Sequence, residues 1–371
     1  MTLSRIVAII ILIFLTQGPG TFYSATVAQA PKYETVKIGL LINNEKSLAA
    51  KQAAAIAIRK ANEKGGLNGR RFELVVRSME GPWGTGSKQA VDLIFGENVW
   101  ALLGSHDGRN AHLVEQAATK AGVVFLSCWS GDPTLSQAFV PWFFNCVPND
   151  NQQAETVVNE IYYKKKFSNI ISVTDKTYDS NQAYMSFKKK AELSGKKEPR
   201  RLICDDYIKD PDSLADLVIK DDHDCLLIFC SPAASSRLLF LLSQRKFNKP
   251  VFGFTLVANE NELSEREMIQ YDNVLKVPAG KWQASQTTDF VKEYRGAYGK
   301  LPGMAAAYAY DGMNALIEAI IIAGIQDREK IQYALGKINL NGVTGPVQFD
   351  SKGNRSGLIS LRYLKNGLPV Q

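Results

Sequence analysis

Short apolar runs alternate with amphipathic segments along most of the chain, and this alternation constrains the fold more than any other feature. The first run, Val36–Ile42, carries a single charged residue, Lys37. Strands this apolar are typical of a parallel sheet that is covered on both faces. A segment of strong helix formers, Ala49–Lys64, follows and ends at Gly65 and Gly66, as an amphipathic helix does. Strand followed by helix predicts a parallel sheet with helices on both faces.

The alternation runs through two successive sets of strands, one on each side of Asp150. The apolar runs that we expect to be strands are Val36–Ile42, Phe72–Arg77, Trp100–Leu103 and Val123–Leu126 in the first set, and Asn169–Val173, Arg200–Cys204, Cys225–Phe229 and Val251–Phe254 in the second. Two helices, Asp289–Tyr298 and Ala305–Ile325, and short strands within Val347–Leu368 complete the chain. The sequence therefore predicts an α/β protein with two doubly wound parallel-sheet lobes.

Residues 1–30 have the pattern of a secretory signal peptide. One positive charge, Arg5, precedes the short apolar run Ile6–Leu15, and the small residues Ala28 and Ala30 form a cleavage motif. The run is short for a bilayer span, which needs roughly 20 apolar residues. We therefore expect export to the periplasm with cleavage near Ala30, and a retained membrane anchor is the alternative.

Composition and charge exclude several classes of function. The 371 residues are 45% hydrophobic and 22% charged, as in globular proteins. The net charge is +7, but the densest basic runs, Lys164–Lys166 and Lys188–Lys190, lie on or beside expected helices. Lysines in such places usually face solvent, so we expect no nucleic-acid partner.

The cysteines and histidines do not predict a metal site, a cofactor or an enzyme. The odd number of cysteines leaves their pairing open; they are Cys128, Cys146, Cys204, Cys225 and Cys230. His106 and His112 are not spaced as a metal pair on one helical face. Ser127 lacks a nucleophile elbow, and the first strand lacks a dinucleotide fingerprint. We expect a monomeric binding protein without a cofactor.

Open parallel sheets bind ligands at the carboxyl ends of their strands. The loops that follow the expected strands at that edge are residues 43–46, 80–87, 104–109, 127–135, 174–182, 230–233 and 255–261. We therefore look for ligand-binding residues in these loops.

A series of short segments shares its order and spacing with a known family. The segments are Lys37–Leu40, Ala61–Gly69, Leu103–Ser105, Ala121–Ser127, Phe144–Asp150, Tyr308–Gly312 and Gly345–Gly353. With them, nearly the whole exported chain resembles the type I periplasmic solute-binding proteins of ABC transporters, in the branched-chain amino acid (Leu/Ile/Val-binding) branch. The resemblance implies a ligand held between two lobes, a membrane permease as partner, and closure about a hinge. A ligand-sensing receptor of the same fold is the alternative.

The resemblance also implies where the lobes divide. The hinge would have three strands, with crossings near Asn149–Asp150, Val277–Pro278 and Thr344–Pro346. The first lobe would comprise residues 32–149 and 278–344, and the second would comprise residues 150–277 and 345–371.

The ligand-binding residues follow from the resemblance and from the strand-end loops. They are Trp83, Ser105, Gly108, Ser127, Trp129, Ser130, Gly131, Asp150 and Tyr178. Backbone N–H groups around Gly108 open a helix and could hold an anion. Trp129 could lie over an apolar or cationic ligand group opposite Tyr178, or it could cover the core of its own lobe. Asp150 could bind a ligand amine or cap a helix.

Three positions depart from the family's pattern. Gly131 stands where the family has a threonine, Gly108 where it has a serine, and Thr255 where an acidic residue often meets the ligand's amino group. These changes argue against an α-amino acid, and the family also takes amides, short carboxylates and aromatic acids. The expected ligand is a small polar or amino-acid-like molecule: an amino acid, an amide or a small carboxylate.

Overall fold

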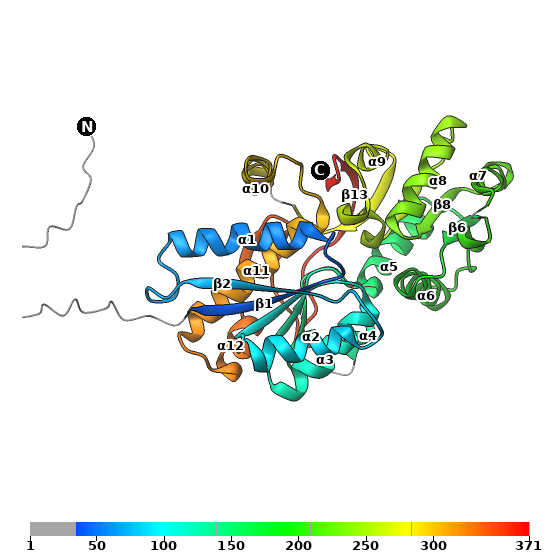
Figure 1. The fold of residues 1–371 in the computed structure, drawn as a ribbon. Coiled ribbons are helices and arrows are strands. Elements are labelled where there is room, and N and C mark those ends of the chain that lie inside the picture. The colour runs from blue at the N-terminus through cyan, green and yellow to red at the C-terminus, as the bar shows by residue number, and fades with distance from the viewer. Residues whose placement is uncertain (1–34, 138–139, 208, 283, 371) are drawn as a thin grey trace, which may run out of the picture. The chain divides into compact units, whose positions relative to one another are not determined.

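Two sheets organise the structure (Figure 1). The computed structural model describes residues 35–137, 140–207, 209–282 and 284–370, so the expected signal peptide lies outside the described residues. The first sheet is parallel throughout. Its strands, from edge to edge, are β2 (Phe72–Ser78), β1 (Val36–Ile42), β3 (Ala101–Ser105), β4 (Phe125–Ser127) and β5 (Phe143–Asn145).

The second sheet is mixed. Its strands, from edge to edge, are β14 (Leu368–Pro369), β13 (Ser360–Lys365), β10 (Leu275–Ala279), β9 (Val251–Gly253), β8 (Cys225–Phe229), β6 (Ile170–Thr174) and β7 (Arg200–Ile203). The five strands from β10 to β7 are parallel, and β13 and β14 add an antiparallel edge. A separate hairpin joins β11 (Leu340–Gly342) to β12 (Gly345–Val347).

Helices cover both faces of the first sheet. They are α1 (Leu48–Glu63), α2 (Thr85–Val91), α3 (Gly108–Ala121), α4 (Thr134–Gln137), α10 (Ala284–Tyr298), α11 (Met304–Ala323) and α12 (Arg328–Gly336). Side chains of a strand point alternately to opposite faces. Ile38 and Leu40 of β1 therefore share a cluster with residues of α1 and α11, whereas Leu41 packs with residues of α2 and α3.

The second sheet is covered in the same way. Its helices are α5 (Asp150–Val158), α6 (Tyr178–Leu193), α7 (Pro211–Lys220), α8 (Pro232–Gln244) and α9 (Glu265–Ile269). Ile171 of β6 packs in the cluster that contains Leu214 of α7 and Leu238 of α8, and Ile170 packs in the cluster with α5 and α6. The predicted fold class, two doubly wound parallel sheets, is confirmed. Among the described helices, none has the length and apolar character that a bilayer span requires.

The chain passes three times between the regions of the two sheets. The first passage leads from β5 to α5, and the second leads from β10 to α10, which contacts α1. Asn354 forms an isolated β-bridge with Asn145 at the end of β5, so the chain is still beside the first sheet there. Strand β13 of the second sheet begins at Ser360, so the third passage lies between these two residues. Gly345 and Pro346, at the expected third crossing, belong to the β11–β12 hairpin. The lobe boundaries themselves stay a prediction.

Arg355 ties the first and third passages together. Its guanidinium donates hydrogen bonds to the Cys146 carbonyl oxygen at 2.8 Å, to Thr344 Oγ1 at 2.7 Å and to the Gly345 carbonyl oxygen at 3.0 Å. Thr344 also donates to the buried carboxylate of Asp311 at 2.5 Å. A planar guanidinium with several fixed acceptors is a rigid connector, so this end of the hinge is well defined.

Candidate ligand-binding site

A cavity of about 500 Å³ lies where loops from the two sheets meet. Its walls are formed by Asn43, Asp107, Arg109, Asn110 and Trp129 after strands β1, β3 and β4, and by Lys176, Thr177, Tyr178, Asp179, Ser231, Pro232, Leu256, Asn259 and Glu262 after strands β6, β8 and β9. Every lining residue thus follows the carboxyl end of a parallel strand, which is the place where open α/β sheets bind ligands.

In the loop after β3 and the first turn of α3, two backbone N–H groups donate hydrogen bonds to the carboxylates of Asp107 and Asp179. Asp107 caps α3, because its side chain accepts a 2.9 Å hydrogen bond from the Asn110 N–H. Gly108 donates its N–H to Asp179 Oδ1 of the opposite sheet at 2.9 Å. A Cβ at Gly108 would lie 2.9 Å from Asp132 Cβ, so this crowded position requires glycine.

The loop after β4 presents Trp129 to the cavity and turns its serines inward. Ser127 Oγ accepts a 3.3 Å hydrogen bond from the Ser130 N–H, and Ser130 Oγ accepts another from the Asp132 N–H at 3.3 Å. Both hydroxyls therefore shape the loop and do not line the cavity. Gly131 packs so closely on Asp150 that a Cβ would overlap Oδ1 of that carboxylate.

Tyr178 and Asp132 join the two sheets at the cavity wall. Tyr178 begins α6, and its hydroxyl donates a 2.7 Å hydrogen bond to Asp132 Oδ2. The guanidinium carbon of Arg109 lies 5.6 Å from the centre of the Tyr178 ring. His112 Nε2 approaches Asp132 Oδ2 at 3.1 Å from the other side. Tyr178 thus lines the cavity as expected and also bridges the sheets.

Of the nine expected residues, Trp129 and Tyr178 line the cavity, and the other seven, Gly108 and Gly131 among them, lie outside its lining. Trp83 is 85% exposed, because β2 is an edge strand and the loop after it lies at the end of the sheet. Ser105 is buried at the end of β3. Asp150 is buried beneath Gly131 and does not cap α5, because Asn149 is the capping residue. Trp129 lines the cavity but is only 7% exposed, and it also packs in the hydrophobic core.

Carboxylates crowd the cavity and change one another's ionisation. Burial, followed by the charge of Asp107, raises the pKa of Asp179 to about 7. Burial, followed by the charges of Asp175 and Asp107, raises the pKa of Glu262. Burial together with Asp179 and Asp132 raises the pKa of Asp150 well above its ordinary value. Each shift means that the charged form of that carboxyl is disfavoured, first by burial and then by the neighbouring carboxylates.

Asp132 differs because it has a cationic partner. Hydrogen bonds to Asp132 and Glu115 raise the pKa of His112 to about 9, so the imidazole is charged at neutral pH. Burial tends to raise the pKa of Asp132, but hydrogen bonds from His112, Thr134 and Tyr178 outweigh burial and lower it. Asp132 is therefore an ionised, fully bonded anchor rather than a free carboxylate.

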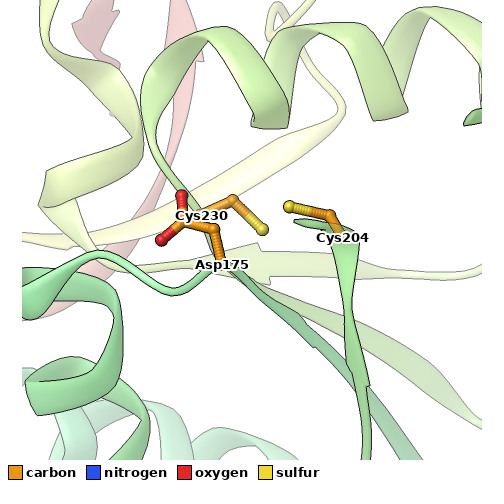
Figure 2. A group of neighbouring side chains, drawn as sticks. All are labelled: Asp175, Cys204 and Cys230. Carbon is orange, nitrogen blue, oxygen red and sulfur yellow. The ribbon is translucent and has the colours of Figure 1, made fainter. Parts of the chain in front are cut away.

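Asp175 lies behind the cavity and holds two of its loops. Its carboxylate accepts hydrogen bonds from the N–H groups of Thr177 and Ser231. Cys204 and Cys230 lie beside it, and one ligand-type atom of each of the three residues lies within 4.8 Å of the others (Figure 2). Burial raises the pKa of the Cys230 thiol well above its ordinary value. Because the carboxylate is already bonded and this thiol stays protonated, we interpret the group as structural.

Several cavity residues were not predicted from the sequence. They include Asn43, Arg109, Asp179, Asn259 and Glu262. All except Glu262 lie within the strand-end loops selected above, and Glu262 lies one residue beyond the last of them. The loops were therefore predictable, but the side chains that turn towards the cavity were not.

The sequence matches the family described as periplasmic binding protein over residues 35–358. The chain belongs to this family. No curated protein matches the sequence significantly. Proteins of this family bind solutes, so the expected family is confirmed at that level, and the branched-chain amino acid branch stays a prediction.

Solved structures of other periplasmic binding proteins share the fold over almost the whole chain. LivJ from Streptococcus pneumoniae, in complex with isoleucine, is 19% identical, with a TM-score of 0.74 over 90% of this chain and 97% of its own. The leucine-binding protein LivK from Thermotoga maritima is 20% identical, with a TM-score of 0.74 over 90% and 96%. A solute-binding protein from R. palustris, in complex with benzoate, is 18% identical, with a TM-score of 0.73 over 91% and 95%.

Proposed function

We propose that this periplasmic binding protein is the solute-binding component of an ABC uptake transporter. It captures a small polar or amino-acid-like molecule and presents it to a membrane permease. The observation that carries the proposal is the cavity of about 500 Å³ lined by strand-end loops of both sheets. Sites for small molecules typically have about 300–1,000 Å³. The solved relatives with isoleucine and with benzoate support a solute of this size.

Capture proceeds by closure about the hinge. Two hydrogen bonds already cross the cavity edge, from the Gly108 N–H to Asp179 and from the Tyr178 hydroxyl to Asp132. A solute that contacts both walls favours the closed arrangement by the difference between its affinities for the closed and open forms. Three chain passages allow one region to rotate on the other without unfolding.

The protein binds its solute without converting it. Burial raises the pKa of the Cys128 thiol, which donates a hydrogen bond to the Gly104 carbonyl oxygen. Ser127 is engaged within its own loop. Neither group is an activated nucleophile at the cavity surface, since activation requires an adjacent base or a lowered pKa.

The test begins with protein purified from the periplasm of its native host. Small molecules released by denaturation are identified by mass spectrometry, and uptake of the identified compound is measured in cells with and without the gene. We expect one compound in near-stoichiometric amount, and loss of its uptake when the gene is deleted. Conversion of the compound by the purified protein, or unchanged uptake in the deletion strain, would contradict the proposal.

A further inference from the structure

The charges of the cavity wall select the class of solute. Asp107, Asp179 and Glu262 bring carboxylates from both sheets to the cavity. The Asp107 and Asp179 carboxylates accept backbone hydrogen bonds at the start of α3. The Glu262 side chain lines the cavity, and its carboxylate makes no hydrogen bond or ion pair with any residue that the structure describes. The Glu262 carboxylate can therefore accept hydrogen bonds from a solute in the cavity.

The cations of the wall do not balance these carboxylates. Lys176 Nζ forms an ion pair with Asp206 Oδ1 at 2.9 Å, outside the cavity lining. The guanidinium of Arg109 lies over the ring of Tyr178. The lining thus holds three carboxylic side chains and two cations, and one of these cations, Lys176, is already paired with Asp206.

Two backbone donors that could hold an anion, both at the start of α3, are already occupied. The N-terminus of α3 is the natural anion site of the cavity. Its Gly108 N–H donates to Asp179, and its Asn110 N–H donates to Asp107. At the loop after β4, the carboxylate of Asp150 lies against Gly131. A solute carboxylate at either loop would therefore meet carboxylates of the protein rather than free donors.

The rest of the wall suits the apolar body of a cation. Trp129, Pro232 and Leu256 line the cavity beside the carboxylates. An aromatic face attracts an organic cation by about 0.5–2 kcal/mol, depending on how far the cation is desolvated. Aromatic and aliphatic groups next to carboxylates thus offer separate contacts to the two parts of such a molecule.

We propose that the solute is a small organic cation whose ammonium or guanidinium group is held by Asp179 and Glu262. Asp107 lies near both carboxylates, and Trp129 contacts the body of the molecule. The assignment rests on the proposed solute-binding function and narrows its ligand class. A bound cation offsets the charge repulsion from Asp107 that, after burial, raises the pKa of Asp179.

Calorimetric titration of the ligand-stripped, refolded protein tests the assignment. The cationic probes are putrescine, spermidine and agmatine, and the comparison probes are leucine, isoleucine, acetamide and benzoate. We expect at least one cationic probe to bind and benzoate not to bind. Asp179→Asn and Glu262→Gln should each weaken that binding about tenfold or more, which corresponds to about 1.4 kcal/mol per decade.

Glu329→Gln is the matched control, because Glu329 is an exposed carboxylate of α12 outside the cavity. It should leave the affinity unchanged, and thermal melts should show that all three variants are folded. Binding of leucine, isoleucine, acetamide or benzoate without any cationic probe would overturn the cation assignment but leave the solute-binding function standing. Failure of both sets of probes would count against both proposals. Equal cation binding by the wild type and both cavity variants would overturn the assigned residues.

Discussion

The Tyr178 hydroxyl donates a 2.7 Å hydrogen bond to Asp132 Oδ2, and this bond joins α6 of the second sheet to the loop after β4 of the first. Tyr178→Phe removes the donor but keeps the ring. A hydrogen bond to a charged group contributes about 1.5–3 kcal/mol, so the ligand-free cavity should open more often and small-angle scattering should show a larger radius of gyration. Tyr333→Phe, at an exposed tyrosine of α12, should change nothing. An unchanged radius of gyration for Tyr178→Phe would show that this hydrogen bond does not hold the ligand-free cavity closed.

Trp129→Ala and Tyr178→Ala should have different effects on the stability of the protein. Trp129 is 7% exposed and packs in the core, so Trp129→Ala should lower the free energy of unfolding by about 3–5 kcal/mol and also weaken solute binding. Tyr178 is half-buried at the cavity wall, so Tyr178→Ala should mainly weaken binding. Thermal melts and calorimetric titration separate the two effects. A Trp129→Ala protein with wild-type stability would show that the ring does not support the core.

Stability should fall as the pH rises, because Asp179 at the cavity and His112 beside Asp132 have raised pKa values. The pKa of Asp179 rises from 3.8 to about 7, next to Asp107, Asp132 and Glu262. The pKa of His112 rises from 6.5 to about 9 between Asp132 and Glu115. A group whose pKa is raised in the folded state stabilises the fold below its unfolded pKa and loses this contribution as the pH passes the folded value.

Denaturant titrations across pH 4–10 check this linkage. Asp179→Asn should remove part of the decline between about pH 4 and 7, by roughly 1 kcal/mol or more, since one pKa unit corresponds to about 1.4 kcal/mol. His112→Gln should remove part of the decline between about pH 6.5 and 9. If both variants follow the pH profile of the wild type, neither group is coupled to folding in the way the structure indicates.

Gly131 should not tolerate a side chain. A Cβ there would overlap the buried carboxylate of Asp150, so Gly131→Ala should lower the free energy of unfolding by about 1–3 kcal/mol. Gly296 in α10 is the matched control, because a Cβ there meets no atom within 4 Å. Gly296→Ala should be neutral or stabilising by up to about 1 kcal/mol. Equal effects of the two substitutions, measured by denaturant titration, would contradict the packing of Asp150 on Gly131.

The strands with continuous apolar runs were the most predictable part of the fold. Val36–Ile42 and Cys225–Phe229 have the bounds expected from the sequence, since both are buried parallel strands. Strand β10 was missed because it contains Pro278, which weakens a strand pattern. Helix α6 begins at Tyr178, but its first turn is polar and lines the cavity, so apolar periodicity does not mark where the helix starts.

The site was predictable as a set of loops but not as a set of side chains. Trp129 and Tyr178 lie in loops that the strand pattern selects, and both line the cavity. The contact between Gly108 and Asp179 joins residues of different sheets, so no local pattern encodes it. Trp83 illustrates the converse: its loop follows a strand in the proper direction, but that strand lies at the edge of the sheet and leaves the ring exposed.

Small-angle scattering with and without the solute tests the central claim, capture between the two sheets by closure, most directly. The solute is the compound released from the periplasmic protein, added back to stripped protein at saturation. We predict a smaller radius of gyration in the saturated protein, with a single binding isotherm of unit stoichiometry by calorimetry. Saturable binding at unit stoichiometry with an unchanged radius of gyration would contradict capture by hinge closure.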